Sequence, residues 1–159
     1  MSTPTPVTAL ARRWRLEIDM SAEKDGSDWQ MVPGITAFTP AAEPNIEDSS
    51  SYDSDGWAEN TKTGQSFELS VTINRKINDL AKTYHPTHEA IRRAAFGWGS
   101  SSEVHLRYMD RTGLPEAYEG TALVTWAPSG GEYTALDQVE LTFTGTGPLL
   151  LIDNPMAGS

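Results

Sequence analysis

The sequence lacks several features that would point to a chemical site or a membrane anchor. It contains no cysteine, which excludes disulfide bonds, thiolate-bound metals and a cysteine nucleophile. Basic residues are few: 12 Lys and Arg stand against 22 Asp and Glu, and the net charge at pH 7 is −10. This balance disfavours equilibrium binding to nucleic acid or to an anionic membrane, because both need many cations. No apolar run approaches the roughly 20 residues that cross a bilayer.

The first ten residues contain Pro and Thr but neither a basic nor an apolar stretch, so we expect no signal peptide and synthesis in the cytosol. What the sequence does contain is alternation of apolar and polar residues, which is typical of half-buried strands. The clearest alternating segments are 67–73 and 139–143, and others lie at 14–20, 29–38, 104–108, 120–126 and 149–152. Turn sequences such as Asp110-Arg111-Thr112-Gly113 separate several of these runs. We therefore predict a mainly β fold, a β-sandwich or barrel-like domain.

One short α-helix is expected beside these strands. Pro86 precedes it, Thr87 is placed to cap it, and Glu89 lies in its first turn, where the helix dipole favours an acid. Gly97 can end it in a left-handed conformation. Its apolar face consists of Ile91, Ala94 and Ala95. We expect this helix to flank the sheet.

The segment 39–64 shows no periodicity and is rich in Ser, Asp, Glu, Pro, Asn and Gly, which predicts a long structureless loop. It holds six acids and one base, Lys62, and so carries −5 of the net charge. It also holds Ile46, Tyr52 and Trp57, which a solvated linker does not need. Apolar anchors among acids predict a loop that orders against a partner. The residues expected to make this assembly contact are Ile46, Tyr52, Asp53, Asp55 and Trp57.

A basic segment could receive this acidic loop. Residues 75–93 contain five bases and two acids, and Arg12, Arg13 and Arg15 add to the positive charge. We hypothesise that the acidic loop of one subunit docks on the basic surface of the next, where charge would set register and encounter rate. The alternative is that both segments are ordinary solvated faces. The predicted docking residues are Arg75, Lys76, Arg92 and Arg93.

Motifs for chemistry are incomplete. Asp53-Ser54-Asp55-Gly56 resembles part of a calcium loop, but the first ligand position is Ser51 and the twelfth is Lys62, where a Glu is required. His85 and His88 are three residues apart, but Pro86 breaks helical geometry between them, and exposed residues at the helix start are the better interpretation. We predict no catalytic residue, no metal site and no cofactor, although a Ser/His/Asp triad need not be contiguous in sequence.

The five tryptophans leave a sugar-binding role open. Trp14 and Trp126 are in phase with apolar strand positions and are expected in the core, whereas Trp57 and Trp98 are the candidates for exposed anchors. A protein interface is the favoured use, because Trp is enriched there. A carbohydrate-binding β-module that uses Trp57 or Trp98 is the alternative.

The order of these features resembles the major tail proteins, or tail-tube proteins, of siphophages. The likeness runs from about residue 13 to residue 151, and its order and spacing carry it, since each motif alone is weak. The matching features, in chain order, are Val32-Pro33-Gly34-Ile35 after Trp29, the acidic loop with Tyr52-Asp53 and Thr63-Gly64, the strand 67–73, the helix after Pro86, Glu119-Gly120-Thr121-Ala122 with Trp126, and Phe143-Thr144-Gly145-Thr146-Gly147.

This resemblance implies a structural virion protein and not an enzyme. It implies one domain over residues 1–159, in which an N-terminal arm (1–11), the assembly loop (39–64) and a C-terminal tail (153–159) bridge subunits. Six subunits would form a ring, and stacked rings would form a tail tube that DNA traverses during ejection without specific binding. The implied partners are a tape-measure protein, a tail terminator and tail-tip proteins. A head-decoration or tail-completion protein of the virion is the alternative.

If the chain forms a tube, one polar strand face would line its lumen. An acidic subunit suits a channel that must not retain DNA, because like charges repel. Strands with one apolar and one polar face suit a sheet between a core and an aqueous channel. The residues predicted for the lumen are Glu68, Ser70 and Thr72 with Glu140, Thr142 and Thr144.

Overall fold

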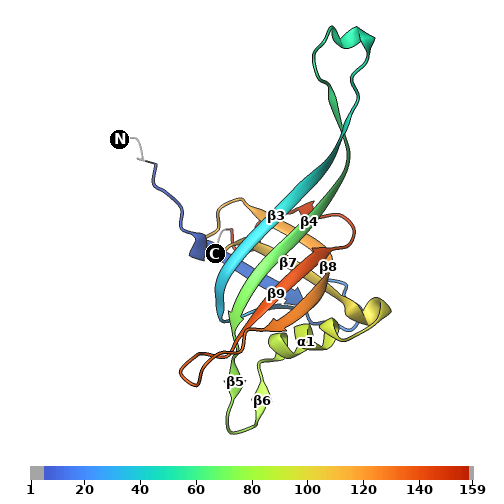
Figure 1. Ribbon diagram of the computed structural model, residues 1–159. Coiled ribbons are helices and arrows are strands. Elements are labelled where there is room, and N and C mark those ends of the chain that lie inside the picture. Colours follow the sequence, from blue (N-terminus) through green and yellow to red (C-terminus); the bar gives the residue numbers. More distant parts are fainter. Residues whose placement is uncertain (1–5, 158–159) are drawn as a thin grey trace.

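Residues 6–157 are described by the computed structural model, in which one large antiparallel sheet dominates (Figure 1). Its strands follow the order β2-β1-β7-β8-β9-β4-β3, and β10 pairs with β8. The strands are β1 (Trp14–Asp19), β2 (Trp29–Met31), β3 (Ile35–Asp48), β4 (Asn60–Asn74), β5 (Ile77–Asn78), β6 (Thr83–Tyr84), β7 (Glu103–Asp110), β8 (Ala117–Pro128), β9 (Gln138–Gly145) and β10 (Leu150–Leu151). The helices are η1 (Ala11–Arg13), η2 (Tyr52–Ser54), α1 (Pro86–Ala95) and η3 (Gly99–Ser102). The predicted mainly β fold with one flanking α-helix is confirmed.

The core lies on one face of the sheet and follows the alternation in the sequence. In β4 and β9 the apolar residues pair directly across the two strands, Leu69 with Phe143 and Val71 with Leu141. All four side chains are buried, with at most 2% of their surface exposed. Because successive side chains of a strand point to opposite faces, the intervening polar residues of both strands are left on the other face.

Helix α1 (Pro86–Ala95) packs Ile91 and Ala94 into this core, but its two ends differ from the prediction. The residue that caps its start is His85, whose Nδ1 accepts from the Thr87 amide at 3.3 Å, and Thr87 is itself buried. The cap lies earlier because Pro86 occupies the first helical position, where its missing N–H costs nothing.

At the other end of α1, Gly97 is not left-handed. The chain leaves the helix through Phe96 at φ −103°. Gly97 is instead required by close approach, since a Cβ there would lie 2.8 Å from the Ser101 carbonyl oxygen. The glycine therefore lets η3 (Gly99–Ser102) fold back beside the end of α1.

The prediction of a structureless loop over 39–64 is wrong. Strands β3 and β4 continue far beyond the body of the sheet as a two-stranded ribbon, paired as far as Asp48 and Asn60 (Figure 1). Only residues 49–59 lie between the strands, and they include η2. The pattern was hidden because the outer ribbon is exposed on both faces, so no apolar alternation marks it. Pro40 and Pro44 are tolerated because β3 is an edge strand of the sheet.

The strands β5 and β6 form a small second sheet at the end of the molecule opposite the ribbon tip (Figure 1). Helix α1 starts directly after β6, so the helix start and this sheet share one end of the molecule. Within residues 6–157, none of the helices has the length and hydrophobicity to cross a membrane. Residues 1–5 of the expected N-terminal arm and 158–159 of the expected C-terminal tail lie outside the described residues.

Candidate assembly site

The six residues predicted for a lumen face lie together on the outward face of β4 and β9. The register pairs Glu68 with Thr144, Ser70 with Thr142, and Thr72 with Glu140. Each side chain is exposed or half-buried. The alternation of both strands, joined by this register, therefore forms one continuous polar patch opposite the core.

The neighbouring strands extend this polar patch. Thr39 of β3 lies next to Ser70, and Thr125 of β8 lies next to Thr142, so four hydroxyl side chains form one row across four strands. The acids of the patch are Glu43, Glu68 and Glu140. No Lys or Arg occupies the outward positions of these four strands over the described ranges 37–43, 66–74, 121–127 and 138–144. We call this area the base-free face.

The outward face of β1 and β7 differs, because its charges are paired. Arg107 Nε donates to Glu17 Oε1 at 2.6 Å, and Arg15 Nε donates to Glu17 Oε2 at 2.9 Å. His105 lies between two acids, with Nδ1 at 3.2 Å from Asp19 Oδ2 and Nε2 at 3.5 Å from the Glu119 carboxylate. We call this area the ion-paired face.

Asp19 anchors the edge of the ion-paired face. Its burial acts to raise its pKa, but hydrogen bonds from the Ser21 hydroxyl, the Ser21 and Gly26 amides and the His105 ring outweigh this and hold the pKa far below the usual value. The carboxylate is thus kept ionised and fully bonded. It organises the turn after β1.

The tip of the ribbon carries most of the residues predicted for the assembly loop. Tyr52 is fully exposed, 79% of the Trp57 surface is exposed, and Ile46 is exposed on β3 below the tip. The tip is nevertheless shaped internally. Ser51 and Ser54 form a reciprocal capping box around η2, the Trp57 amide donates to the Ser54 carbonyl at 3.0 Å, and the Glu59 amide donates to Ser50 Oγ at 2.8 Å.

The acids at the tip do not gather around a cation site. Asp53 lies in η2 and Asp55 follows it in a left-handed conformation, with φ of 53°. Within residues 6–157, no group of three or more His, Asp or Glu side chains is arranged to hold a metal ion. The tip therefore presents separate carboxylates beside two exposed aromatic rings.

The predicted basic residues lie at the opposite end of the molecule, and they differ in availability. Arg92 and Arg93 both bond to Glu89, with Nε–oxygen distances of 3.1 and 3.4 Å. The Arg92 hydrogen bond is the largest cause of the lowered pKa of Glu89, and the same bond raises the pKa of Arg92. Lys76 is exposed, whereas Arg75 is half-buried between aromatic rings. Sequence charge alone does not distinguish these environments.

The histidine prediction requires a correction. His88 is fully buried and not exposed at the helix start. Its Nε2 lies 2.8 Å from the Pro33 carbonyl oxygen, and its Nδ1 accepts from the Lys76 amide at 3.3 Å. Because a carbonyl only accepts, Nε2 carries the proton and the ring is neutral. Burial first, and then the charges of His85, Arg75 and Lys76, lower the pKa of His88.

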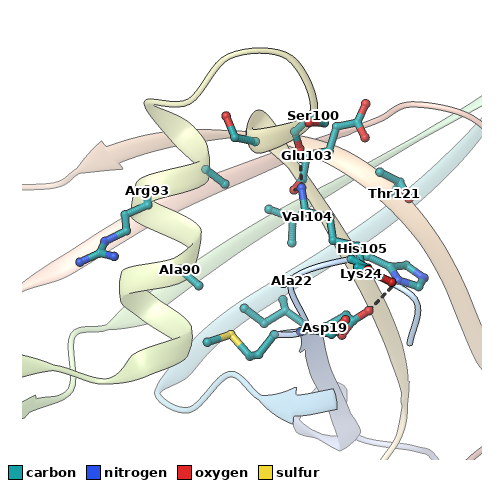
Figure 2. A pocket seen from close by; sticks show the side chains of 16 residues that line it. Asp19, Ala22, Lys24, Ala90, Arg93, Ser100, Glu103, Val104, His105 and Thr121 are labelled. Atoms are coloured by element: carbon teal, nitrogen blue, oxygen red, sulfur yellow. Dashed lines mark hydrogen bonds and ion pairs between the residues drawn. The ribbon is translucent and has the colours of Figure 1, made fainter. Parts of the chain in front are cut away.

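A pocket of about 840 Å³ lies between α1 and the turn after β1, and sequence reasoning missed it (Figure 2). Lys24 lines the pocket and donates to the backbone carbonyls of Ser100 and Glu103, the latter at 2.6 Å. Asp19 and His105 face each other at the lower edge, joined by the dashed line in Figure 2. Asp19 and His105 thus pair with each other, and Lys24 has two carbonyl acceptors within the fold.

The tryptophans lie largely where their patterns indicated. Trp14 and Trp126 are partly buried against the core cluster. Trp57 and Trp98 are exposed over 79% and 89% of their surface. Trp57 is at the ribbon tip and Trp98 precedes η3, so the two rings belong to separate surfaces.

Comparison with known proteins adds a family and a fold. A sequence model of a family described as "Phage tail tube protein" matches residues 15–150. A search of curated proteins found no match.

Several solved structures have a similar fold, including three tail or baseplate structures. The tail of an empty gene transfer agent particle, refined helically with C6 symmetry, has a TM-score of 0.69 at 16% identity, over 91% of this chain and 99% of that one. The SPP1 tail tube has a TM-score of 0.69 at 12% identity, over 92% and 80%. The six-fold symmetrised baseplate of the anti-feeding prophage has a TM-score of 0.59 at 11% identity, over 94% and 97%. At these identities the likeness concerns the fold alone.

Proposed function

The chain belongs to the phage tail tube protein family and is a structural subunit of a virion tail, and from this premise we propose that six copies close into a ring and that rings stack into a tube that conducts DNA during ejection. Support for six copies comes from the similar fold of a gene transfer agent tail refined with C6 symmetry. The role is structural and includes no reaction.

The observation that carries this proposal is the base-free face. Its hydroxyl row and its three acids would form a channel wall without a cation that could hold a phosphate. DNA binding is driven by Lys and Arg that displace counterions, so a wall without them lets the polyanion slide. We assign Glu68, Ser70, Thr72, Glu140, Thr142 and Thr144 to the lumen on this ground.

The ribbon would connect successive rings. It projects from one end of the subunit, and the basic residues lie at the other end (Figure 1). A contact between opposite ends of identical subunits is heterologous and propagates as an open stack. In this role Ile46, Tyr52 and Trp57 supply apolar contact, and Asp53 and Asp55 supply charge toward the surface around Arg75, Lys76, Arg92 and Arg93.

The sheet edges would form the contacts within a ring. Strands β2 and β3 end the strand order and leave edges that a neighbouring copy can extend. The further partners that we propose are a tape-measure protein inside the tube, a terminator at the head end and a tip complex at the other end. Synthesis in the host cytoplasm precedes assembly, and no membrane contact is involved.

Electron microscopy of the purified protein at high concentration, at two salt levels, tests the proposal. Hollow tubes or stacked rings of uniform diameter with six-fold end views are expected. Closed rings or trimers that never stack would favour a head-decoration or tail-completion role. Monomers at every concentration, also after addition of a tail-tip complex, would refute self-assembly into a tube.

The charge-docking part has its own test. Reversal of both Arg92 and Arg93 to Glu should weaken stacking, and the loss should be larger at low salt, where charges are least screened. The conservative pair Arg92→Lys and Arg93→Lys is the control. Unchanged assembly of the reversed variant at low salt would contradict docking on this surface.

A further inference from the structure

Arg75 has an environment that a surface arginine does not need. Its guanidinium carbon lies 3.8 Å from the ring centre of Tyr84 and 4.9 Å from that of Trp126. The Nε and Nη2 atoms are buried, and neither has a hydrogen-bond partner within residues 6–157. Buried N–H groups are nearly always paired, and an unpaired charged donor is costly. Arg75 is therefore held in place by two rings but lacks an acceptor.

The groups around Arg75 favour an anion as the missing acceptor. Lys76 follows it, and the field of both cations reaches His88, which is buried nearby. The acid on the neighbouring helix, Glu89, is already bonded to Arg92 and Arg93. A guanidinium has a planar fork of donors that matches a carboxylate, so a carboxylate is the ligand chemistry that this site fits.

We propose that Arg75 is the receptor for a carboxylate from the ribbon tip of a second copy of this chain, an inference that rests on the proposed stacking. The segment 48–59 at the tip holds Asp48, Asp53, Asp55 and Glu59 and no base. Arg75 follows β4 and precedes β5, and β5 lies at the end of the subunit opposite the ribbon tip (Figure 1). A head-to-tail stack would therefore bring the tip of one copy to Arg75 of the next.

Tyr84 controls the access of a carboxylate to the Arg75 guanidinium. It lies on the two-residue strand β6, and 45% of its surface is exposed. Movement of this ring would uncover the guanidinium while Trp126, on the long strand β8, keeps it oriented. Arg75 then binds the docked carboxylate. Arg92 and Arg93 are already paired with Glu89 and mainly affect the rate at which two subunits meet.

The substitution Arg75→Met separates docking from folding. It keeps an unbranched apolar stem but removes the guanidinium, with its charge and its donors. Because it removes a buried cation that has no partner, the urea midpoint of the subunit should not fall. Stacking, measured as the lowest protein concentration that gives sedimenting tubes, should need about tenfold more protein or more, the scale expected for a lost charge-assisted pair. Arg75→Lys should also stack poorly, because an ammonium lacks the planar fork.

The control is Lys82→Met, which removes an exposed cation between β5 and β6, at the same end of the molecule but outside the predicted docking residues. It should change the stacking threshold less than about threefold. If Arg75→Met stacks at the wild-type threshold, the inference is overturned and the proposed tube remains. If Arg75→Met unfolds or loses stability in step with stacking, its role is structural and the inference is also overturned. Wild-type protein that never stacks would overturn both the proposed tube and the inference about Arg75.

A mixing experiment tests the pairing directly. A tip variant in which Asp48, Asp53 and Asp55 are replaced by Asn and Glu59 by Gln keeps its own Arg75 but has no carboxylate in the segment 48–59. The Arg75→Met variant keeps its tip carboxylates but cannot bind a carboxylate from another copy. At a protein concentration between the wild-type and the Arg75→Met thresholds, each variant alone should fail to stack. An equimolar mixture should give paired units that do not elongate, because only one of the two interfaces is intact. A mixture that behaves like its separate components would refute the pairing.

Discussion

The outward surface of the sheet is divided into two areas, the ion-paired face and the base-free face, in which charges are arranged in opposite ways. On the ion-paired face, Glu17 is only 5% exposed and is held by Arg15 and Arg107. On the base-free face, Ser70 and Thr142 lie side by side with no cation beside them. Both are outward faces of the same antiparallel sheet, so strand geometry cannot explain the contrast. Charge on the first face stabilises the fold, whereas the chemistry of the second is free to serve the proposed channel.

The largest effect on stability is expected on the ion-paired face. Arg107→Leu leaves the buried Glu17 with only Arg15, and it should lower the free energy of unfolding by about 3 kcal/mol. Urea denaturation measures this. Thr142→Val on the base-free face is the control and should stay within about 0.5 kcal/mol. Equal losses in the two variants would contradict the division between the faces.

A second variant of the ion-paired face tests how much the Asp19 carboxylate contributes to the free energy of unfolding. Asp19→Asn removes an acceptor that is ionised and fully bonded, and it should cost about 2 kcal/mol at pH 7. The folded-state pKa is depressed, so this contribution is present above the unfolded pKa of about 3.9 and is lost as pH falls through the lower folded value. The gap between variant and wild type should therefore narrow below about pH 4 in urea titrations. Glu68→Gln on the base-free face is the control, and at neutral pH its free energy of unfolding should equal that of the wild type.

The buried His88 lies on neither face, and its effect on the free energy of unfolding should be of intermediate size. Burial lowers the folded-state pKa of His88 below the unfolded value of about 6.5. Its contribution is therefore complete above about pH 6.5. As pH falls, the unfolded state takes up a proton that the folded state refuses, and stability should fall by up to about 1.4 kcal/mol per pH unit.

His88→Gln, which can still donate to the Pro33 carbonyl, should remove that slope between pH 6.5 and pH 5. Urea titrations at several pH values measure it. His85→Gln is the matched control, because His85 is less buried. A slope that persists in His88→Gln would place the titrating group elsewhere.

The smallest effect on stability is expected on the base-free face, where the effect on function should be clear. Thr142→Lys should change the free energy of unfolding by less than about 0.5 kcal/mol, since the side chain is not in the core. Assembled tubes of this variant should retain DNA in a salt-dependent manner, because each ring gains cations facing the polyanion. Filter retention of labelled DNA across a salt series measures this. DNA retention no higher than that of Thr142→Val tubes would remove these strands from the lumen.

The sequence was informative wherever one face of an element is buried. The period-two pattern of β4 and β9 identified Leu69 and Phe143 as core and, by the same count, identified Ser70 and Thr142 as outward. The pattern failed for the ribbon, because a ribbon exposed on both faces has no apolar alternation to detect. The start of α1 was misplaced by two positions, from the observed cap His85 to Thr87, because His is not an expected cap.

The contacts between distant residues were beyond sequence reasoning. Glu17 and Arg107 are 90 positions apart, and only the register of β1 with β7 brings them together. The site at Arg75 needs Tyr84 from β6 and Trp126 from β8, and no local spacing marks this combination. Charge counts identified the basic segment, but they could not separate the neutralised Arg92 from the unpaired Arg75.

The continuity of β4 has a mechanical consequence. The same strand runs from the ribbon tip at Asn60 to Asn74 at the far end of the sheet, and it pairs with β9 over seven consecutive positions. A pull on the tip along the ribbon axis therefore loads this ladder in shear, so that its hydrogen bonds resist together and are not peeled apart one by one. A tail that bends or is stretched would transmit tension from ring to ring through the stiffest direction of each subunit.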